Sequence, residues 1–217
     1  MLNDIQAEIL RQVADLAALP ETGAVNLRSD GQRAFHRDSE HVHIVSKTDK
    51  DGIDIHIDPG TKGETVHIPV VITKSGVKDL VYNDFFIGEG AEVKIVAGCG
   101  IHNCGGCDSE HDGIHTFHVG KNAKVTYVEK HYGEGDGAGK RILNPQTILY
   151  LEEGASVTLD TSQIKGVDDT KRYTRAVVGE NAEIVIQEKL LTHGAQKAES
   201  EMDVFLNGAG SKTRVVS

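Results

Sequence analysis

The sequence has no tryptophan, only four prolines and only three cysteines among its 217 residues, whereas glycine occurs 24 times. Little proline and much glycine fit a chain with many tight turns and a slim core. The cysteines lie between positions 99 and 107, and an odd, local set of thiols does not make a disulfide framework. We therefore expect a cytoplasmic protein, in a reducing compartment, with one domain and an appendage.

The sequence also lacks long apolar runs and an excess of basic residues. No apolar stretch approaches membrane-spanning length, and the N-terminus has no signal-peptide pattern. The formal net charge is −10, from 23 Lys and Arg against 33 Asp and Glu. Because a nucleic-acid partner requires a basic face, the sequence predicts neither a nucleic-acid nor a membrane partner.

The chain does contain a short repeated phrase, in five copies. The copies are G-E-G-A-E-V-K-I-V at 88–96, G-K-N-A-K-V-T-Y-V at 120–128, E-E-G-A-S-V-T-L-D at 152–160, G-E-N-A-E-I-V-I-Q at 179–187 and G-A-G-S-K-T-R-V-V at 208–216. We number each copy from its small residue, taken as position zero: Ala91, Ala123, Ala155, Ala182 and Ser211. Repeats of this length with strand-like content indicate a β-solenoid.

The repeat has a physical reason at each position. Position −1 is always Gly or Asn, the two residues that best tolerate positive φ: Gly90, Asn122, Gly154, Asn181 and Gly210. Apolar residues at +2 and +4 alternate with polar ones, and a second apolar pair occupies −6 and −4. In the last copy this phase places Phe205 inward at −6. We expect an all-β parallel β-helix; an antiparallel sandwich is the alternative, but it leaves the recurring corner unexplained.

The N-terminal part differs from the repeats. Residues 2–18 have the apolar spacing of an amphipathic helix, which Pro20 and Gly23 end, and a polar linker fills 28–40. We expect the helix to cover the first coil or a partner. The β-helix core then spans 41–217, with regular repeats from about residue 80. Because the sequence stops directly after the strand of the fifth copy, we expect a C-terminal cap and helical domain to be missing.

The densest group of potential metal ligands lies between the first two copies. Cys99, Cys104 and Cys107 have the spacing C-x4-C-x2-C, and His102 and His111 lie beside them. Soft thiolates select Fe or Zn, and imidazole suits the same metals. These five residues are the candidate metal ligands. A plain glycine-rich loop is the alternative, and both interpretations stay open.

Three other features of the sequence are notable. Position −5 of the repeat should point outward, yet its residues are mostly apolar, which predicts either an interface or a surface that a return loop covers. These residues are Phe86, His118, Tyr150, Val177 and Leu206. The segment 133–140, G-E-G-D-G-A-G-K, resembles a phosphate-binding loop but lacks its first glycine and its final Ser or Thr. The segment 168–175 has the pattern of a mixed-charge loop.

Beyond these patterns, the chain resembles a known family. The run A-S-V-T-L-D-T-S-Q-I-K-G-V at 155–167, the turn G-E-N-A-E-I-V-I at 179–186 and the segment L-P-E-T-G-A-V-N-L-R at 19–28 are similar to SufB/SufD-type iron–sulfur cluster assembly scaffolds. The similarity is greatest to the short archaeal and anaerobe-type members.

The resemblance implies a right-handed β-helix without enzymatic activity that forms a SufB/SufD-type homo- or heterodimer. It further implies a SufC-type ATPase partner, a cysteine desulfurase system as sulfur source, and an iron–sulfur cluster held transiently at the interface of two scaffold subunits. Two alternatives of other classes remain: a carbohydrate-active β-helix enzyme, which needs stacked acidic pairs on one outer sheet, and a purely structural interaction module.

Overall fold

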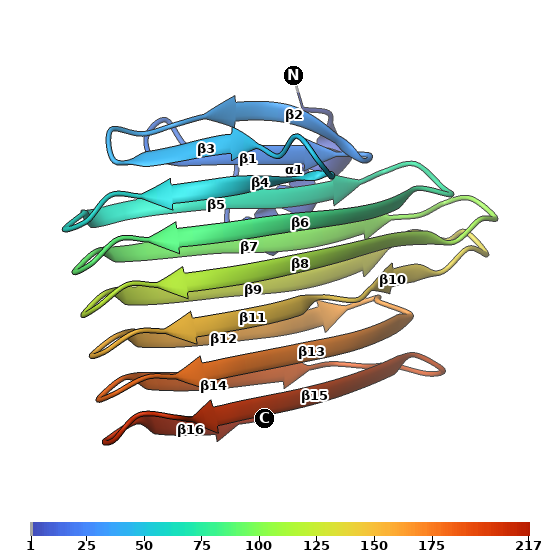
Figure 1. The fold of residues 1–217 in the computed structure, drawn as a ribbon. Coiled ribbons are helices and arrows are strands. Elements are labelled where there is room, and N and C mark those ends of the chain that lie inside the picture. Colours follow the sequence, from blue (N-terminus) through green and yellow to red (C-terminus); the bar gives the residue numbers. More distant parts are fainter. Residues whose placement is uncertain (1) are drawn as a thin grey trace.

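The computed structural model describes residues 2–217 and is a parallel β-helix of about six turns with one helix on its outside (Figure 1). The elements are α1 (Asp4–Ala14), β1 (Ala24–Ser29), β2 (Gln32–Arg37), β3 (Val42–Ser46), β4 (Gly52–Ile57), β5 (Lys62–Ile72), β6 (Lys78–Ile87), β7 (Glu92–His102), β8 (Ser109–Val119), β9 (Lys124–Glu134), β10 (Arg141–Leu143), β11 (Gln146–Leu151), β12 (Ser156–Lys165), β13 (Asp169–Val178), β14 (Glu183–Leu190), β15 (Lys197–Leu206) and β16 (Lys212–Val216).

Successive strands of the repeats alternate between two facing sheets, so each coil contributes to both. The first sheet has the order β16-β14-β12-β9-β7-β5-β1-β2, and the second has the order β10-β13-β11-β8-β6-β4-β3 with β15 beside β13. The strands of the repeats pair in parallel, and equivalent positions pair with each other, as Val93 does with Val125 and Val125 with Val157. The predicted all-β parallel β-helix with an N-terminal helix is therefore confirmed.

Each coil turns at a residue in the left-handed region, as the repeat predicted. The φ angles are 67° at Gly90, 57° at Asn122, 69° at Gly154 and 53° at Asn181. The amide of each corner residue donates to a carbonyl in the next coil, for example Asn122 N to Glu153 O at 3.0 Å. The corner therefore carries its own ladder of hydrogen bonds along the axis.

The apolar core lies between the two sheets, beside these corners. Phe85 stacks on Phe117 with ring centroids 4.3 Å apart and planes 2° apart. The corner alanines are fully buried below the left-handed residues. Each buried branched or aromatic side chain contributes roughly 1.5–3 kcal/mol, so the stacked core holds the coils together.

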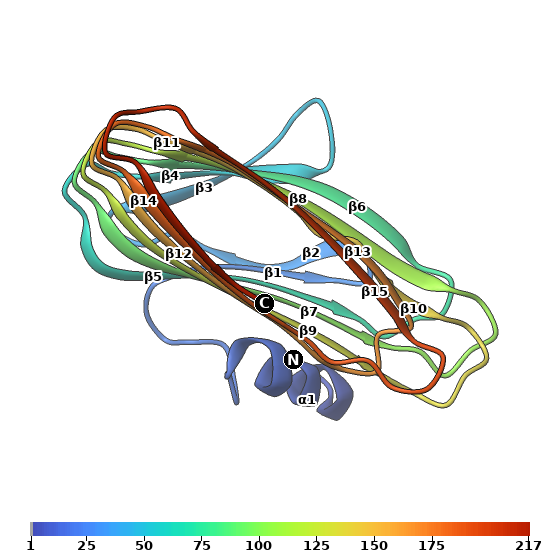
Figure 2. The ribbon, with the colours of Figure 1, turned by 90° about the horizontal axis from the view of Figure 1, so that it is seen from below.

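Helix α1 lies on the outer face of the first sheet, across β5, β7 and β9 (Figure 2). It begins at the capping box of Asn3 and Gln6 and ends at Asp15, whose φ is 56°. A Cβ on Gly98 would lie 2.3 Å from Val13 O, so the strand needs glycine where the helix approaches. The helix is shorter than the predicted span 2–18. It covers the outer face of a sheet, whereas we expected it to cover the first coil or a partner. Within residues 2–217, no helix is long and apolar enough to cross a bilayer.

The polar stretch 28–40 is not a linker. Its first part completes β1 and its centre forms β2, and the two strands pair antiparallel around the turn Asp30–Gly31, whose φ angles are 48° and 80°. Two positive φ values identify the tight hairpin turn that Asp-Gly favours. The polar composition reflects β2, which ends the first sheet and is largely exposed.

The last coil departs from the predicted phase by one residue. Val177 pairs with Phe205, so Phe205 and not Leu206 continues the outward row at position −5. The reason is an extra residue in the final corner, where the amides of Asn207 and Gly208 both donate to Val178 O, at 3.0 and 3.2 Å. Phe205, predicted inward, is 44% exposed, with the Arg175 guanidinium 5.2 Å from its ring centroid.

We predict that Asn122→Val destabilises the protein by about 1–2 kcal/mol while Asn122→Gly changes stability by less than about 0.5 kcal/mol, because only the branched residue is strained at positive φ. Chemical denaturation of both variants measures the difference. Lys121→Val, at the exposed neighbour in the same corner, is the control for added apolar surface. Equal stabilities of the two Asn122 variants would contradict the role of the left-handed corner.

Candidate functional site

The three cysteines lie at the end of the coil farthest from the left-handed corners, but in different environments. Strand β7 runs into a return loop at residues 103–108, which leads to β8. Cys99 lies in β7 and is buried, whereas Cys104 and Cys107 lie in the loop and are exposed. Burial raises the pKa of the Cys99 thiol well above its ordinary value, so this thiol stays protonated.

A chain of four side chains starts at Cys104. Its Sγ lies 3.0 Å from His102 Nε2, and His102 Nδ1 lies 3.0 Å from Glu134 Oε1. The Tyr132 hydroxyl donates to Glu134 Oε2 at 2.9 Å. Burial, reinforced by that hydrogen bond, raises the pKa of Tyr132 to about 12, so the tyrosine remains a donor. The sequence showed Cys104 and His102 but gave no sign of Glu134, which lies in the next coil.

The loop is held from within by Asn103, which is fully buried. Its Nδ2 donates to Cys107 O at 2.8 Å, and its Oδ1 accepts from Gly105 N at 3.0 Å. Ser75, from the preceding coil, donates its hydroxyl proton to the same Cys107 carbonyl at 2.9 Å and accepts from Cys107 N at 3.1 Å. The backbone around both thiols is therefore fixed.

The segment 133–140 packs directly against this loop, and the close packing of the two backbones explains its glycines. Gly137 N donates to Asn103 O at 3.2 Å, and Gly139 N donates to Gly105 O at 3.0 Å. A Cβ on Gly137 would lie 2.3 Å from Gly105 O, and one on Gly139 would lie 2.1 Å from Cys107 O. The alternating glycines thus serve a close backbone stack on the cysteine loop, not a phosphate.

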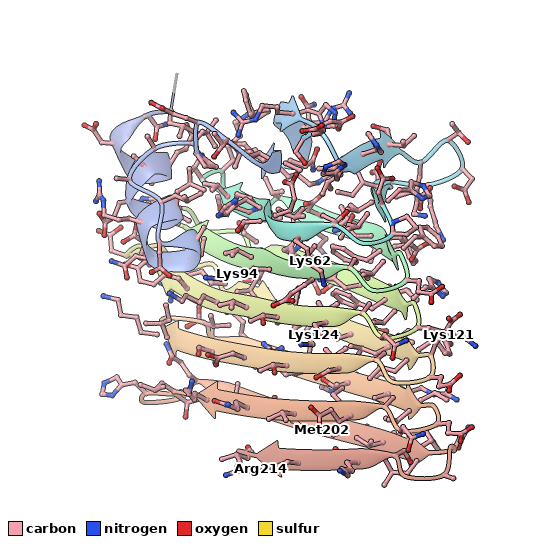
Figure 3. The ribbon with its side chains drawn as sticks, turned by 90° about the vertical axis from the view of Figure 1, so that its left-hand side faces the viewer. Lys62, Lys94, Lys121, Lys124, Met202 and Arg214 are labelled. Carbon is pink, nitrogen blue, oxygen red and sulfur yellow. The ribbon has the colours of Figure 1, made fainter. Side chains whose placement is uncertain are left out.

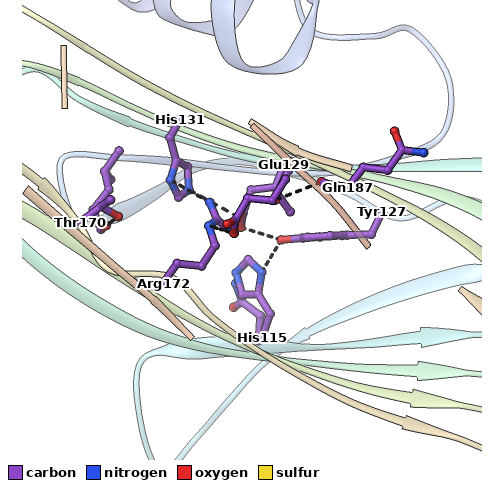
Figure 4. Close-up of polar contacts among 11 residues, drawn as sticks. His115, Tyr127, Glu129, His131, Thr170, Arg172 and Gln187 are labelled. Atoms are coloured by element: carbon purple, nitrogen blue, oxygen red, sulfur yellow. Dashed lines mark hydrogen bonds and ion pairs between the residues drawn. The ribbon is translucent and has the colours of Figure 1, made fainter. Parts of the chain in front are cut away.

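Behind the loop, the inside of the β-helix is polar (Figure 4). Glu129 accepts from the Tyr127 hydroxyl at 2.8 Å and from Arg172 Nη1 at 2.6 Å. His115 Nδ1 lies 2.7 Å from the Tyr127 hydroxyl on the other side. Arg172, whose side chain is 2% exposed, also lies 3.5 Å from Glu188 Oε1. The buried guanidinium of Arg172 thus lies between the carboxyl groups of Glu129 and Glu188 and is paired on two sides.

The network sets the charges inside the β-helix. Burial alone would raise the pKa of Glu129, but attraction by Arg172, His131 and His115 lowers it to about 2. Burial lowers the pKa of His115 to about 4 and that of His131 to about 3, against the attraction of Glu129. At neutral pH Glu129 is therefore a carboxylate, and His115 and His131 are neutral imidazoles.

The predicted metal ligands do not converge. His111 is buried, and its Nδ1 lies 3.0 Å from Asp79 Oδ2, a carboxylate that Arg28 also binds. Cys99 and His111 instead border a cavity of about 20 Å³, room for one water molecule. Within residues 2–217, no group of three or more His, Cys, Asp or Glu side chains is arranged to hold a metal ion. Of the five predicted ligands, His102 and Cys104 are hydrogen-bonded to each other.

Sequence reasoning missed Glu129, His131 and Arg172. The first two continue the inward alternation of β9 beyond Tyr127, at positions +6 and +8, so extending the period-two pattern would have found them. Arg172 belongs to β13, where a mixed-charge loop was expected. The neighbouring inward positions are also polar: Thr161, Gln163 and Glu188.

The outward row at position −5 forms a ladder of stacked rings. His56 stacks on Phe86 at 4.9 Å between ring centroids, Phe86 on His118 at 5.0 Å, and His118 on Tyr150 at 5.5 Å. Tyr150 is 42% exposed, so the described residues do not cover the row with a return loop.

A comparison of the chain with protein-family models and with curated proteins finds no match.

Two histidines of the interior network, His115 and His131, predict a pH dependence of the stability. Below pH 6.5 the unfolded chain takes up their protons while the folded protein does not until about pH 4 and 3, so stability falls as the pH falls. Each histidine contributes a slope of up to about 1.4 kcal/mol per pH unit. We expect His131→Gln to reduce the slope between about pH 6.5 and 5, measured by urea unfolding. His193→Gln, an exposed histidine, should keep the wild-type slope; equal slopes in all three proteins would refute the assignment.

Proposed function

We propose that this protein is a non-enzymatic scaffold subunit of iron–sulfur cluster assembly of the SUF type. The observation that carries the proposal is the cysteine loop, where two exposed thiols and one imidazole lie on a fixed segment of a parallel β-helix. Thiolate and imidazole are soft and borderline donors that suit iron, as they suit zinc. The cluster is cargo here, not a resident cofactor.

Two features support a cluster built on the outside and shared between chains. The interior cavity of about 20 Å³ has no room for a cluster. The donors at the loop are the exposed Cys104 and Cys107 and the partly buried His102. They are fewer than the four ligands that a cluster takes, so a second subunit would supply the rest. This agrees with the SufB/SufD-type dimer, the SufC-type ATPase and the cysteine desulfurase system that the resemblance implies, in the cytoplasm.

A carbohydrate-active enzyme is less well supported. The outer face of the sheet that contains β7 and β9 carries the basic side chains Lys62, Lys94 and Lys124 (Figure 3). At position +1, Glu92 lies between Lys62 and Lys124, and Lys62 Nζ is 3.6 Å from Glu92 Oε2. The charges at these positions thus alternate in sign from one strand to the next. No acidic pair is stacked there for acid–base chemistry.

We predict that wild-type protein, incubated anaerobically with ferrous iron and sulfide, retains both, and that Cys104→Ser with Cys107→Ser loses most of them. The two loop thiols are the accessible donors, whereas Cys99 is buried. Iron and sulfide analysis after gel filtration measures retention.

Cys99→Ala is the matched control, since it removes a thiol without touching the loop, and it should retain iron and sulfide as wild type does. Retention by the double variant equal to wild type, or no retention by any protein, would reject the scaffold in favour of a structural module.

We further propose that the outward row, with His118 and Tyr150 at its centre, is the dimer surface. Tyr150→Glu should shift the protein toward a folded monomer with an unchanged circular dichroism spectrum, because a charge would be buried on association. Analytical ultracentrifugation measures the change. Gln146→Glu adds the same charge at an exposed position of the same strand, β11, and should leave the oligomer intact. A dimer unaffected by Tyr150→Glu would place the interface elsewhere.

A further inference from the structure

We infer that Cys104 and Cys107 form a redox-active dithiol that exchanges with disulfide substrates, with Cys104 as the attacking thiol, His102 as its base and Glu134 as the positioning residue. The pair has the spacing Cys-Gly-Gly-Cys, and both thiols are exposed. This C-x-x-C spacing recurs in dithiol oxidoreductases because it lets one thiol resolve the mixed disulfide formed by the other.

The hydrogen bonds fix which nitrogen of His102 faces the thiol. Glu134 Oε1 accepts a hydrogen bond at 3.0 Å from His102 Nδ1–H, so Nε2 carries the lone pair and accepts a hydrogen bond from the Cys104 thiol at 3.0 Å. The Tyr132 hydroxyl holds the second oxygen of Glu134 at 2.9 Å. Nucleophile, base and orienting carboxylate are therefore all within hydrogen-bond reach, the arrangement that activates a cysteine.

The loop allows the second thiol to follow. Cys107 is anchored through its backbone by Asn103 and Ser75, which leaves its side chain exposed. Between the cysteines, a Cβ on Gly106 would meet nothing within 4 Å. The two intervening glycines thus present no side chain that would keep the sulfurs apart, which matters because a disulfide requires Cβ atoms about 3.5–4.5 Å from each other.

The reaction balances without a further reagent. The Cys104 thiol gives its proton to His102 Nε2 and attacks one sulfur of the substrate disulfide, which breaks the substrate S–S bond and forms a mixed disulfide. The leaving thiolate takes the proton. Cys107 then attacks Cys104 Sγ, forms the Cys104–Cys107 disulfide and releases the second substrate thiol. The protein dithiol is oxidised by two electrons, and the substrate disulfide is reduced to two thiols.

This inference does not rest on the proposed scaffold function, because exchange proceeds without iron or sulfide. The two are connected through the same sulfurs: a loop whose thiols are joined has no loop thiolate left for iron.

The test uses the full chain and oxidised glutathione as the probe, at neutral pH and free of metal. Mass spectrometry of wild type should show an intramolecular disulfide on the peptide that contains both loop cysteines, and no modification of Cys99. Cys107→Ser should instead accumulate glutathione on Cys104. His102→Gln should slow the reaction of Cys104 by about tenfold or more, since a positioned base contributes at least that much.

A second variant covers the case in which His102→Gln does not fold. Glu134→Gln keeps the contact between His102 and Cys104 but removes the carboxylate, and it should slow exchange less than His102→Gln does. Circular dichroism confirms folding of each variant. Equal reaction rates of Cys104 in Cys107→Ser and of Cys107 in Cys104→Ser would overturn the inference. Mixed glutathione disulfides in wild type without a Cys104–Cys107 bond would also overturn it.

Discussion

The whole architecture depends on one backbone constraint, a left-handed residue at the same phase of every coil. Glycine and asparagine alternate there, and the reason is spatial. A Cβ on Gly154 would lie 2.4 Å from Asn122 Oδ1, and a Cβ on Gly210 would lie 2.4 Å from Asn181 Oδ1. Each asparagine side chain thus occupies the space above the next glycine. The corner fixes the phase, and the phase puts like side chains over like.

The fixed phase divides the interior into two halves with different chemistry. Next to the corner, positions +2 and +4 stack apolar side chains and supply the hydrophobic stabilisation. Farther along the same strands, the inward positions hold Glu129, His131 and their partner Arg172. Buried charges contribute little net stability, but removing one partner costs several kcal/mol because the other is left unpaired. The polar half therefore specifies which coils lie side by side, since each charge finds its partner in another coil.

The sequence predicted what local chemistry decides and missed what distant contacts decide. Asn122 and Gly154 could be assigned to corners because positive φ restricts residue choice at a single position. The docking of α1 could not be predicted. In the sequence, Gly98 is only a weak β-former within a strand, and its role in letting the helix approach is seen only in the structure. Arg172 was missed because a buried arginine is rare, and its carboxylate partners, Glu129 and Glu188, lie in other strands. The one-residue shift at Phe205 comes from an extra residue in the final corner. The spacing between repeats does not show where in the coil an extra residue lies.

The cysteine loop shows how a parallel β-helix can hold surface thiols in place. A return loop is ordinarily the mobile part of a solenoid, because few backbone groups in it are paired. Here the glycines of the next return loop stack on it backbone to backbone, and the buried Asn103 closes it from inside. Glu134, which orients His102, ends the strand of that next coil. The surface thiol and its base are thus set by the same coil-to-coil register that builds the core, and a one-residue slip between β7 and β9 would separate them while leaving each strand intact.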